Sequence, residues 1–163
     1  MNEVDRAAFV ARYGGIYEHS PWVAEAIYDA GQADKANDPD ALHAAMAAVV
    51  DAAGREAQLA LLRAHPDLAG RLALAGELTA SSSAEQAGAG LDQCSPEELA
   101  RFQDLNTRYT SCFGFPFILA VKGKTRAEIL AAFEARVDSD AETEFATALE
   151  QVHRIALLRL KEI

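Results

Sequence analysis

Two residues in this sequence are suited to proton transfer, and each stands beside a predicted helix boundary. His65 ends an apolar helical pattern and is followed at once by Pro66. Because a proline keeps the preceding residue out of the α-helical region, the helix is predicted to end at His65. Glu85 follows Ser82 by three residues, which is the spacing of a capping box that begins a helix. A histidine and a carboxylate held at helix ends are suited to general acid–base catalysis.

Both residues also have purely structural explanations. The exposed carbonyl groups at a helix C-terminus favour a protonated imidazole, so His65 is either a proton donor or a histidine that only hydrogen-bonds those carbonyls. In a capping box, the carboxylate of Glu85 would reach back to the Ser82 amide, which explains Glu85 without catalysis. The same helix start would also offer N–H groups to an anionic or carbonyl-rich ligand. Spacing alone leaves these alternatives open.

Arg159 is the third candidate, because it lies on the apolar face of the last predicted helix. Phe145, Val152 and Arg159 are spaced by sevens and fall on nearly one line, whereas Glu150 and Lys161 point the opposite way. A buried guanidinium must be paired with a carboxylate or with carbonyl oxygens, since an unpaired buried charge is costly. We therefore expect an internal salt bridge, an arginine that reaches solvent at the helix end, or an anion-binding site.

An aromatic segment, residues 113–121, follows a long predicted helix. Its sequence is Phe113-Gly114-Phe115-Pro116-Phe117-Ile118-Leu119-Ala120-Val121. Only Phe117 to Val121 is predicted to be extended, and most of its side chains are expected to line a core. Extended backbone also offers N–H and C=O groups, which would pair with a heterocycle that alternates such groups along its edge, such as an imidazolone.

Helices are predicted to position all of these residues. Four start signals, each an N-cap residue or a capping box, support this: Ser20-Pro21, Asp38-Pro39, Ser95-Pro96-Glu97-Glu98 and Thr125-Arg126-Ala127-Glu128. A shorter run from Glu56 to Ala64 must end near His65, and the last helix should run from about Asp140 to Lys161. One short extended segment cannot form a sheet by itself. We predict an all-α single domain, residues 1–163, of about eight irregularly packed helices.

Composition restricts the class of function. The chain has 163 residues, the length of one domain, and a net charge of −10 from 15 basic and 25 acidic residues. That charge argues against nucleic-acid binding, which needs a basic face. It leaves room for an anionic substrate, since one buried arginine can dominate a local site. No apolar run approaches the roughly 20 residues of a membrane span, and no signal peptide is visible, so we expect a cytoplasmic protein.

The sequence suggests neither a metal site nor a bound cofactor. The four histidines show neither HExxH nor His-x3-His spacing. No glycine-rich phosphate loop or pyridoxal-lysine context is present. Cys94 and Cys112 form no CxxC pair and are expected to be reduced thiols. Cys112 lies close to the aromatic segment and is predicted to be buried rather than a nucleophile.

Four motifs, taken in order, resemble the OHCU decarboxylases, the 2-oxo-4-hydroxy-4-carboxy-5-ureidoimidazoline decarboxylases of uric acid degradation. They occupy residues 14–22, 65–70, 81–88 and 113–117, with sequences GGIYEHSPW, HPDLAG, SSSAEQAG and FGFPF. The resemblance covers nearly the whole chain, and the four motifs together are specific. It implies a homodimeric, cofactor-free enzyme that converts the product of urate oxidation and hydrolysis into (S)-allantoin.

The resemblance also assigns residues to the site. It implies that His65 is the catalytic proton donor, that Glu85 is the catalytic acidic residue, and that Arg159 in Leu158-Arg159-Leu160 is an active-site arginine. The matching substrate-binding residues are Pro66, Ser82, Ser83, Ala84, Glu85, Gln86, Phe117, Ile118, Leu119, Ala120 and Val121. On this interpretation Glu85 holds the hydroxyl or ureido groups of the substrate. Arg159 neutralises its charge, and the extended segment holds the edge of its ring.

Two other interpretations belong to different functional classes. A small helical interaction domain would use these motifs as caps and core, would have no deep polar pocket, and would satisfy Arg159 with an internal carboxylate. A ureide hydrolase of the same pathway would be favoured by a metal requirement.

Overall fold

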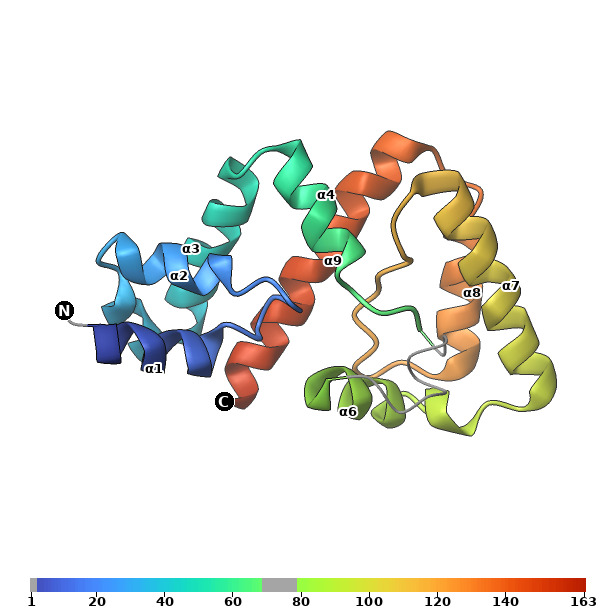
Figure 1. The fold of residues 1–163 in the computed structure, drawn as a ribbon. Helices are drawn as coiled ribbons and strands as arrows, with labels where there is room; N and C mark the ends of the chain where they lie inside the picture. Colours follow the sequence, from blue (N-terminus) through green and yellow to red (C-terminus); the bar gives the residue numbers. More distant parts are fainter. Residues whose placement is uncertain (1–2, 69–78) are drawn as a thin grey trace. The chain divides into compact units, whose positions relative to one another are not determined.

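The computed structural model describes residues 3–68 and 79–163, and in these ranges the chain forms eight α-helices, two short 3-10 helices and no strand. This confirms the predicted all-α fold. The contacts divide the chain into two units (Figure 1). The first unit runs to Ala64 and also contains Val152–Ile163, and the second is His65–Gln151.

The N-terminal helices make up most of the first unit. Their bounds are α1 Glu3–Tyr13, α2 Trp22–Asp29, η1 Ala33–Asn37, α3 Pro39–Ala52 and α4 Arg55–Arg63. α2 packs against both α1 and α3. Asp38 begins α3 as predicted: its carboxylate accepts the Asp40 N–H at 3.1 Å, and Pro39 takes the first helical position.

The predicted cap at Ser20 is wrong. α2 begins at Trp22 after Pro21, and no side chain caps it. The Ser20 hydroxyl instead donates to the Glu18 carbonyl at 3.2 Å. Between them, His19 has a positive φ of 53°, which is uncommon for a residue with a side chain. The chain therefore turns tightly before α2, and the serine is used within that turn.

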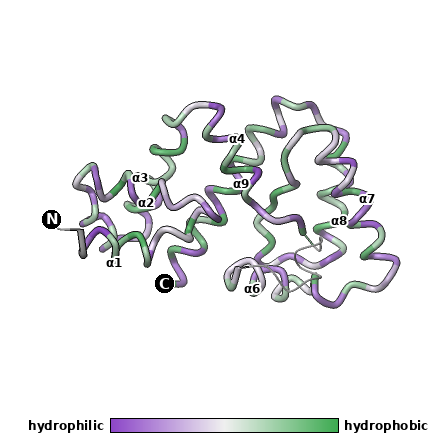
Figure 2. Tube along the Cα trace, viewed as in Figure 1, coloured by the Kyte–Doolittle hydropathy of each residue, from purple (hydrophilic) through white to green (hydrophobic). Residues whose placement is uncertain are grey.

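The second unit is built on α6 Ala80–Gly88, η2 Leu91–Gln93, α7 Pro96–Phe113 and α8 Arg126–Arg136. Both capping boxes predicted here are present. The Ser95 hydroxyl accepts the Glu98 N–H at 3.1 Å, and the Glu98 carboxylate accepts the Ser95 N–H at 3.0 Å. Thr125 and Glu128 make the equivalent pair of bonds at the start of α8. In Figure 2, α7 alternates between hydrophobic and hydrophilic stretches, as expected for a helix that buries one face.

The direction of α7 and α8 explains why the link between them, residues 114–125, forms no helix. The two helices run the same way (Figure 1), with Glu98 paired to Arg126 near their starts and Arg108 to Asp138 near their ends. The link between them must therefore return along α7, which is about 27 Å long at 1.5 Å per residue. A helical link of twelve residues is too short for that distance, whereas an extended one reaches it.

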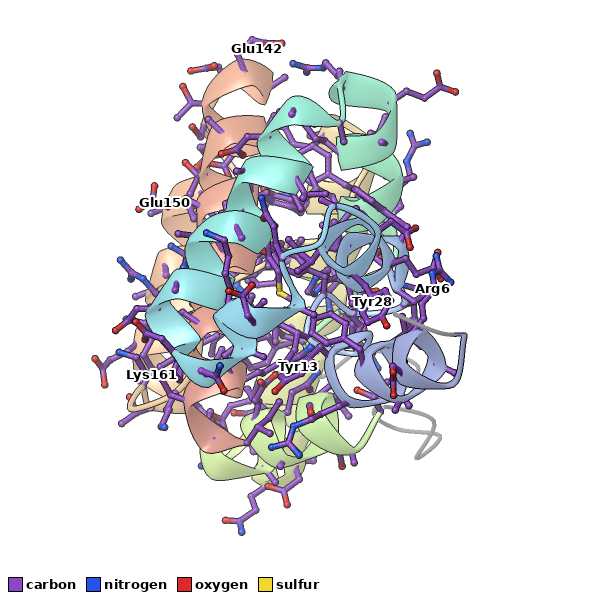
Figure 3. All side chains as sticks on the ribbon, turned by 90° about the vertical axis from the view of Figure 1, so that its left-hand side faces the viewer. Arg6, Tyr13, Tyr28, Glu142, Glu150 and Lys161 are labelled. Carbon is purple, nitrogen blue, oxygen red and sulfur yellow. The ribbon has the colours of Figure 1, made fainter. Side chains whose placement is uncertain are left out.

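The last helix, α9 Ala141–Glu162, contributes to both units. Phe145, Val152 and Arg159 are buried, at 7%, 1% and 6% exposed, which confirms the predicted apolar line. Glu150 and Lys161 are exposed and project outward from the helix in Figure 3.

The prediction that Cys112 is buried is wrong, because the thiol is exposed in the last turn of α7. The core next to this turn is filled by Phe115, which is 3% exposed and meets Tyr109 edge-on. No helix within the described ranges is long and apolar enough to cross a membrane.

Candidate active site

His65 is buried directly after α4. The helix ends at Arg63, Ala64 follows as its C-cap, and His65 is 8% exposed. The sequence prediction of a helix end at this residue is therefore confirmed. A buried imidazole can exchange a proton only with a group that enters the interior.

Two amide side chains hold the segment that follows His65. Gln86 of α6 donates to the Asp67 carbonyl at 3.2 Å, and Asn106 of α7 donates to the Leu68 carbonyl at 3.0 Å. Both amides are buried, at 5% and 6% exposed. Burial also raises the pKa of the Asp67 carboxyl. The backbone next to His65 is thus fixed from two helices.

Asn106 was not predicted, although the sequence carries a signal for it. It shares the buried face of α7 with Phe102, Leu105 and Tyr109, and it is the polar member of that pattern. Ala69 and Gly70, which complete the His-Pro motif, lie outside the described residues.

The predicted capping box at Ser82 and Glu85 is wrong, because α6 begins one turn earlier. Thr79 is the N-cap, and its hydroxyl accepts the Ser82 N–H at 3.2 Å. Ser82 is therefore the third helical residue. Glu85 lies a turn further along and is half-buried. The structural explanation of Glu85 as a capping residue no longer applies.

Only some residues of the predicted binding stretch on α6, residues 82–86, face the interior. Ser82 and Gln86 lie one turn apart on the buried face, at 4% and 5% exposed. Ser83 and Ala84 are exposed, and Glu85 lies between the two environments. Of this stretch, Ser82 and Gln86 therefore face the interior, and Glu85 lies at its margin.

The segment from Phe117 to Val121 is buried throughout, at 1% to 9% exposed. Arg136 of α8 donates from Nη1 to the Ile118 carbonyl at 2.7 Å. The Ala120 N–H donates to Oε1 of Gln151 on α9 at 3.0 Å. Two alternate residues of the segment are thus held by protein side chains.

Arg136, which is partly buried, is the centre of a polar cluster. Its Nε lies 2.9 Å from Oε1 of Glu144, which also accepts the Tyr109 hydroxyl at 2.6 Å. Its guanidinium carbon lies 4.5 Å from the centre of the Phe117 ring, in cation–π geometry. Burial, together with the hydrogen bond to Glu144, raises the pKa of Tyr109.

The site residues predicted from the sequence did not include Arg136, Glu144 or Gln151. Glu144 and Gln151 are spaced by seven, directly before Phe145 and Val152 of the recognised apolar line. Their neighbouring position would have indicated that they are buried polar residues of α9.

Arg159 lies in the first unit, where it is paired with a buried carboxylate. Its Nη2 is 2.8 Å from Oε2 of Glu18, and the two side chains are 5% and 1% exposed. Its Nη1 also lies 3.3 Å from the Ile16 carbonyl and 3.4 Å from that of Gly15. Of the three alternatives, the arginine that reaches solvent is wrong, and an internal salt bridge is present. Glu18, inside the first motif, was not predicted as its partner.

A second network of the first unit surrounds His153. Its Nδ1 lies 2.8 Å from the Tyr17 hydroxyl, and its Nε2 lies 3.2 Å from Oδ1 of Asp51. Nε2 of His43 bonds the His153 carbonyl at 2.7 Å. Across the part of the chain that the structure describes, no group of three or more His, Cys, Asp or Glu residues is arranged to hold a metal ion.

Comparison with known proteins gives full-length similarities. The family described as OHCU decarboxylase matches residues 2–161. The chain is 49% identical to the 2-oxo-4-hydroxy-4-carboxy-5-ureidoimidazoline decarboxylase of Haloferax volcanii over 162 residues, 99% of this chain and 92% of that protein. It is 41% identical to the uric acid degradation bifunctional protein PucL of Bacillus subtilis, covering all of this chain and 32% of that protein.

A solved structure of an (S)-allantoin synthase is similar with a TM-score of 0.75 and 40% identity. The match covers 96% of this chain and 50% of that one, so this chain spans half the length of that protein. The similarity therefore extends well beyond the four motifs.

Proposed function

We propose a mechanism on the premise that this chain belongs to the OHCU decarboxylase family. The chain is a carboxy-lyase of urate degradation that removes CO2 from 2-oxo-4-hydroxy-4-carboxy-5-ureidoimidazoline and forms (S)-allantoin. The observation that carries this conclusion is the 49% identity over 99% of the chain to a decarboxylase of that name. Residues 1–163 act as one decarboxylase domain, in agreement with a family match that runs across both units.

The substrate itself supplies the electron sink for the reaction. Its carboxylate is attached to a carbon next to a C=N bond, so the electron pair released with CO2 can flow into the imine. The protein must turn the carboxylate out of the ring plane, stabilise the electron-rich intermediate and deliver a proton to one face. These tasks need orientation and hydrogen bonding, for which no cofactor is required.

His65 is assigned as the proton donor, or as the hydrogen-bond donor to the developing charge. Its burial supports this role, because an imidazole away from water interacts strongly with a charge that develops beside it. The side-chain amides of Gln86 and Asn106 support it further, since they fix the backbone that follows the histidine.

Glu85 is assigned to the hydroxyl or ureido N–H groups of the substrate. The start of α6 at Ala80 supports this, because Glu85 is then not the third helical residue that a capping box requires. Ser82 contributes its side chain rather than its backbone N–H, which Thr79 already accepts. The match to the family's motifs also assigns Pro66, Ser83, Ala84 and Gln86 to this side of the site, with Ser83 and Ala84 on the exposed face of α6.

The segment Phe117–Val121 is assigned to the edge of the ring. Ile118 and Ala120 are held by Arg136 and Gln151, and the Val121 carbonyl accepts the Lys124 N–H at 3.0 Å. Counting only the described residues, no hydrogen bond reaches the backbone N–H or C=O of Leu119. A buried peptide of this kind is suited to pair with a ligand.

Arg159 is assigned to the anionic substrate because it matches the arginine of the family's Leu-Arg-Leu motif. Its pairing with Glu18 refines the role that the sequence suggested. The pair has no net charge, so Arg159 acts by directed N–H groups rather than by neutralising the carboxylate alone.

The test is CO2 release from freshly generated substrate, followed with purified chain and without it, in the presence and absence of a chelator. We expect release well above the uncatalysed rate, unchanged by the chelator. A rate equal to the blank contradicts the proposal. A rate abolished by the chelator and restored by a divalent metal would favour the ureide hydrolase. The homodimer and the cytoplasmic location remain predictions, and light scattering of the purified protein tests the first.

A further inference from the structure

The backbone of Phe117–Val121 takes part in two hydrogen bonds with side chains of α8 and α9. The two contacts fall on Ile118 and Ala120, which are alternate residues. In extended backbone, the N–H and C=O groups of alternate residues point the same way, and those of the residue between them point the opposite way. The two contacts therefore direct the Leu119 peptide groups away from α8 and α9.

Arg136 is itself fixed before it reaches the segment. Glu144, one of its partners, is 2% exposed and is also bonded by Tyr109, so the carboxylate has two donors. The guanidinium lies against the Phe117 ring, next to the residue whose carbonyl it binds. A planar guanidinium can bind Glu144 and the Ile118 carbonyl at once, whereas an ammonium group is a single point of charge.

Gln151 makes the second contact from the same helix as Glu144. The two residues are seven apart on α9, so they lie on nearly one line, separated by about 10 Å along the axis. α9 therefore holds the segment at two levels, directly through Gln151 and through Glu144 by way of Arg136.

We propose that Arg136 and Gln151 are positioning residues for substrate binding, which hold Ile118 and Ala120 so that the Leu119 peptide faces the substrate ring. This inference rests on the proposed function, in which the segment binds the substrate. Neither residue touches the substrate. Their effect is on affinity, because a segment that is held in place before binding loses less conformational entropy when it binds.

The test compares substitutions that remove a contact with substitutions that keep its chemistry. Gln151→Met removes the acceptor for the Ala120 N–H at similar size, and Gln151→Glu keeps an acceptor there. Arg136→Lys keeps the charge but cannot reach both of its partners. The matched controls are Gln103→Met and Arg108→Lys on the exposed side of α7, where Arg108 makes only a surface pair with Asp138 at 3.9 Å.

Three quantities are measured for each variant: the KM and kcat for the substrate, the inhibition constant of (S)-allantoin, and the melting temperature. We expect Gln151→Met and Arg136→Lys to raise KM and the inhibition constant about five- to tenfold, the effect of one lost hydrogen bond. The kcat should change by less than about threefold, because the reacting groups are untouched. Gln151→Glu should restore both affinities, and the two controls should match the wild type.

A purely structural role would lower the melting temperature and leave both affinities of the folded protein unchanged, which would overturn the inference while the proposed function stands. If Gln151→Met does not fold, Gln151→Asn replaces it, since the shorter amide withdraws the acceptor by one methylene. A wild-type chain that neither releases CO2 from the substrate nor binds (S)-allantoin would overturn the proposed function and the inference together.

Discussion

His65 is proposed to donate the proton, and the substitution His65→Asn tests this role. His65→Asn keeps a polar side chain of similar size but cannot supply a proton. We expect kcat to fall by at least about a hundredfold, the usual contribution of a general acid. The melting temperature should change by no more than about 3 °C, since little packing is lost. Turnover at the wild-type rate would show that the acid–base assignment is wrong.

Substitutions of Thr79 and Glu85 should affect different quantities: the free energy of unfolding for Thr79, and kcat/KM for Glu85. Thr79→Ala should lower the free energy of unfolding by about 1 kcal/mol, because the hydroxyl that caps α6 is lost. Glu85→Gln should leave that energy nearly unchanged and reduce kcat/KM, since Thr79, and not a Ser82–Glu85 box, caps α6. Urea denaturation and steady-state kinetics measure the two effects. Intact activity in Glu85→Gln would remove Glu85 from the site.

Arg159 and Glu18 form one buried pair, so their variants must be compared. Arg159→Lys should reduce kcat/KM on the order of a hundredfold, about 2.7 kcal/mol, because a point charge cannot reproduce a planar fork of donors. Glu18→Gln leaves the guanidinium buried without its counter-charge, which should cost about 3 kcal/mol of stability.

Kinetics measured on the folded fraction decide between a catalytic and a structural arginine. An Arg159→Lys protein with wild-type kcat/KM and reduced stability would mean that the pair with Glu18 serves only the fold.

At the scale of elements, the capping box of α7 makes stability depend on pH. The pKa of Glu98 lies below its ordinary value because its carboxylate accepts the Ser95 backbone N–H and, secondly, a bond from Arg126. A lowered pKa in the folded protein contributes stability above the ordinary value of about 4.3, and this contribution is lost as pH falls through the folded pKa.

We therefore expect Glu98→Gln to lower the melting temperature at about pH 6 and to converge with the wild type as the pH approaches about 3. Glu97→Gln is the matched control, since it removes one charge from the same turn without touching the box. A difference between Glu98→Gln and the wild type that stays constant over this range would contradict the assignment.

Helix starts were predictable where one capping residue stood before an apolar pattern. Ser95 and Thr125 are examples, and both form complete boxes. The start of α6 was missed because residues 79–83 offer several hydroxyl side chains in a row, TASSS, and local spacing does not choose among them. The cap predicted at Ser20 is wrong because a tight turn at His19 uses the Ser20 hydroxyl instead.

The candidate site was predictable in part, for a related reason. The sequence marks His65, Glu85 and Arg159 by their positions at helix ends or on an apolar face. It does not show the distant contacts that fix the surroundings of these residues. Examples are the hydrogen bond from Asn106 to the Leu68 carbonyl, 38 residues away, and the ion pair of Glu18 with Arg159. Those partners depend on how the helices pack.

At the scale of the whole molecule, the family resemblance carried more information than any single pattern. Pattern alone left Arg159 divided among a salt bridge, an arginine that reaches solvent and an anion site, and the structure contains the salt bridge. The helical interaction domain also predicted that contact, so Arg159 does not separate the two interpretations. Full-length identity to named decarboxylases separates the two interpretations, because it extends over 99% of the chain.

The central claim is that this chain both removes CO2 and delivers the proton to one face of the intermediate. In water, the planar intermediate can be protonated on either face, so the uncatalysed product is racemic. The most direct measurement is circular dichroism of allantoin formed in deuterated water, combined with mass spectrometry. We expect the S enantiomer alone, with deuterium at the former carboxylate carbon. A racemic product formed faster than the uncatalysed background would contradict it, because the protein would then release the intermediate before His65 could protonate it.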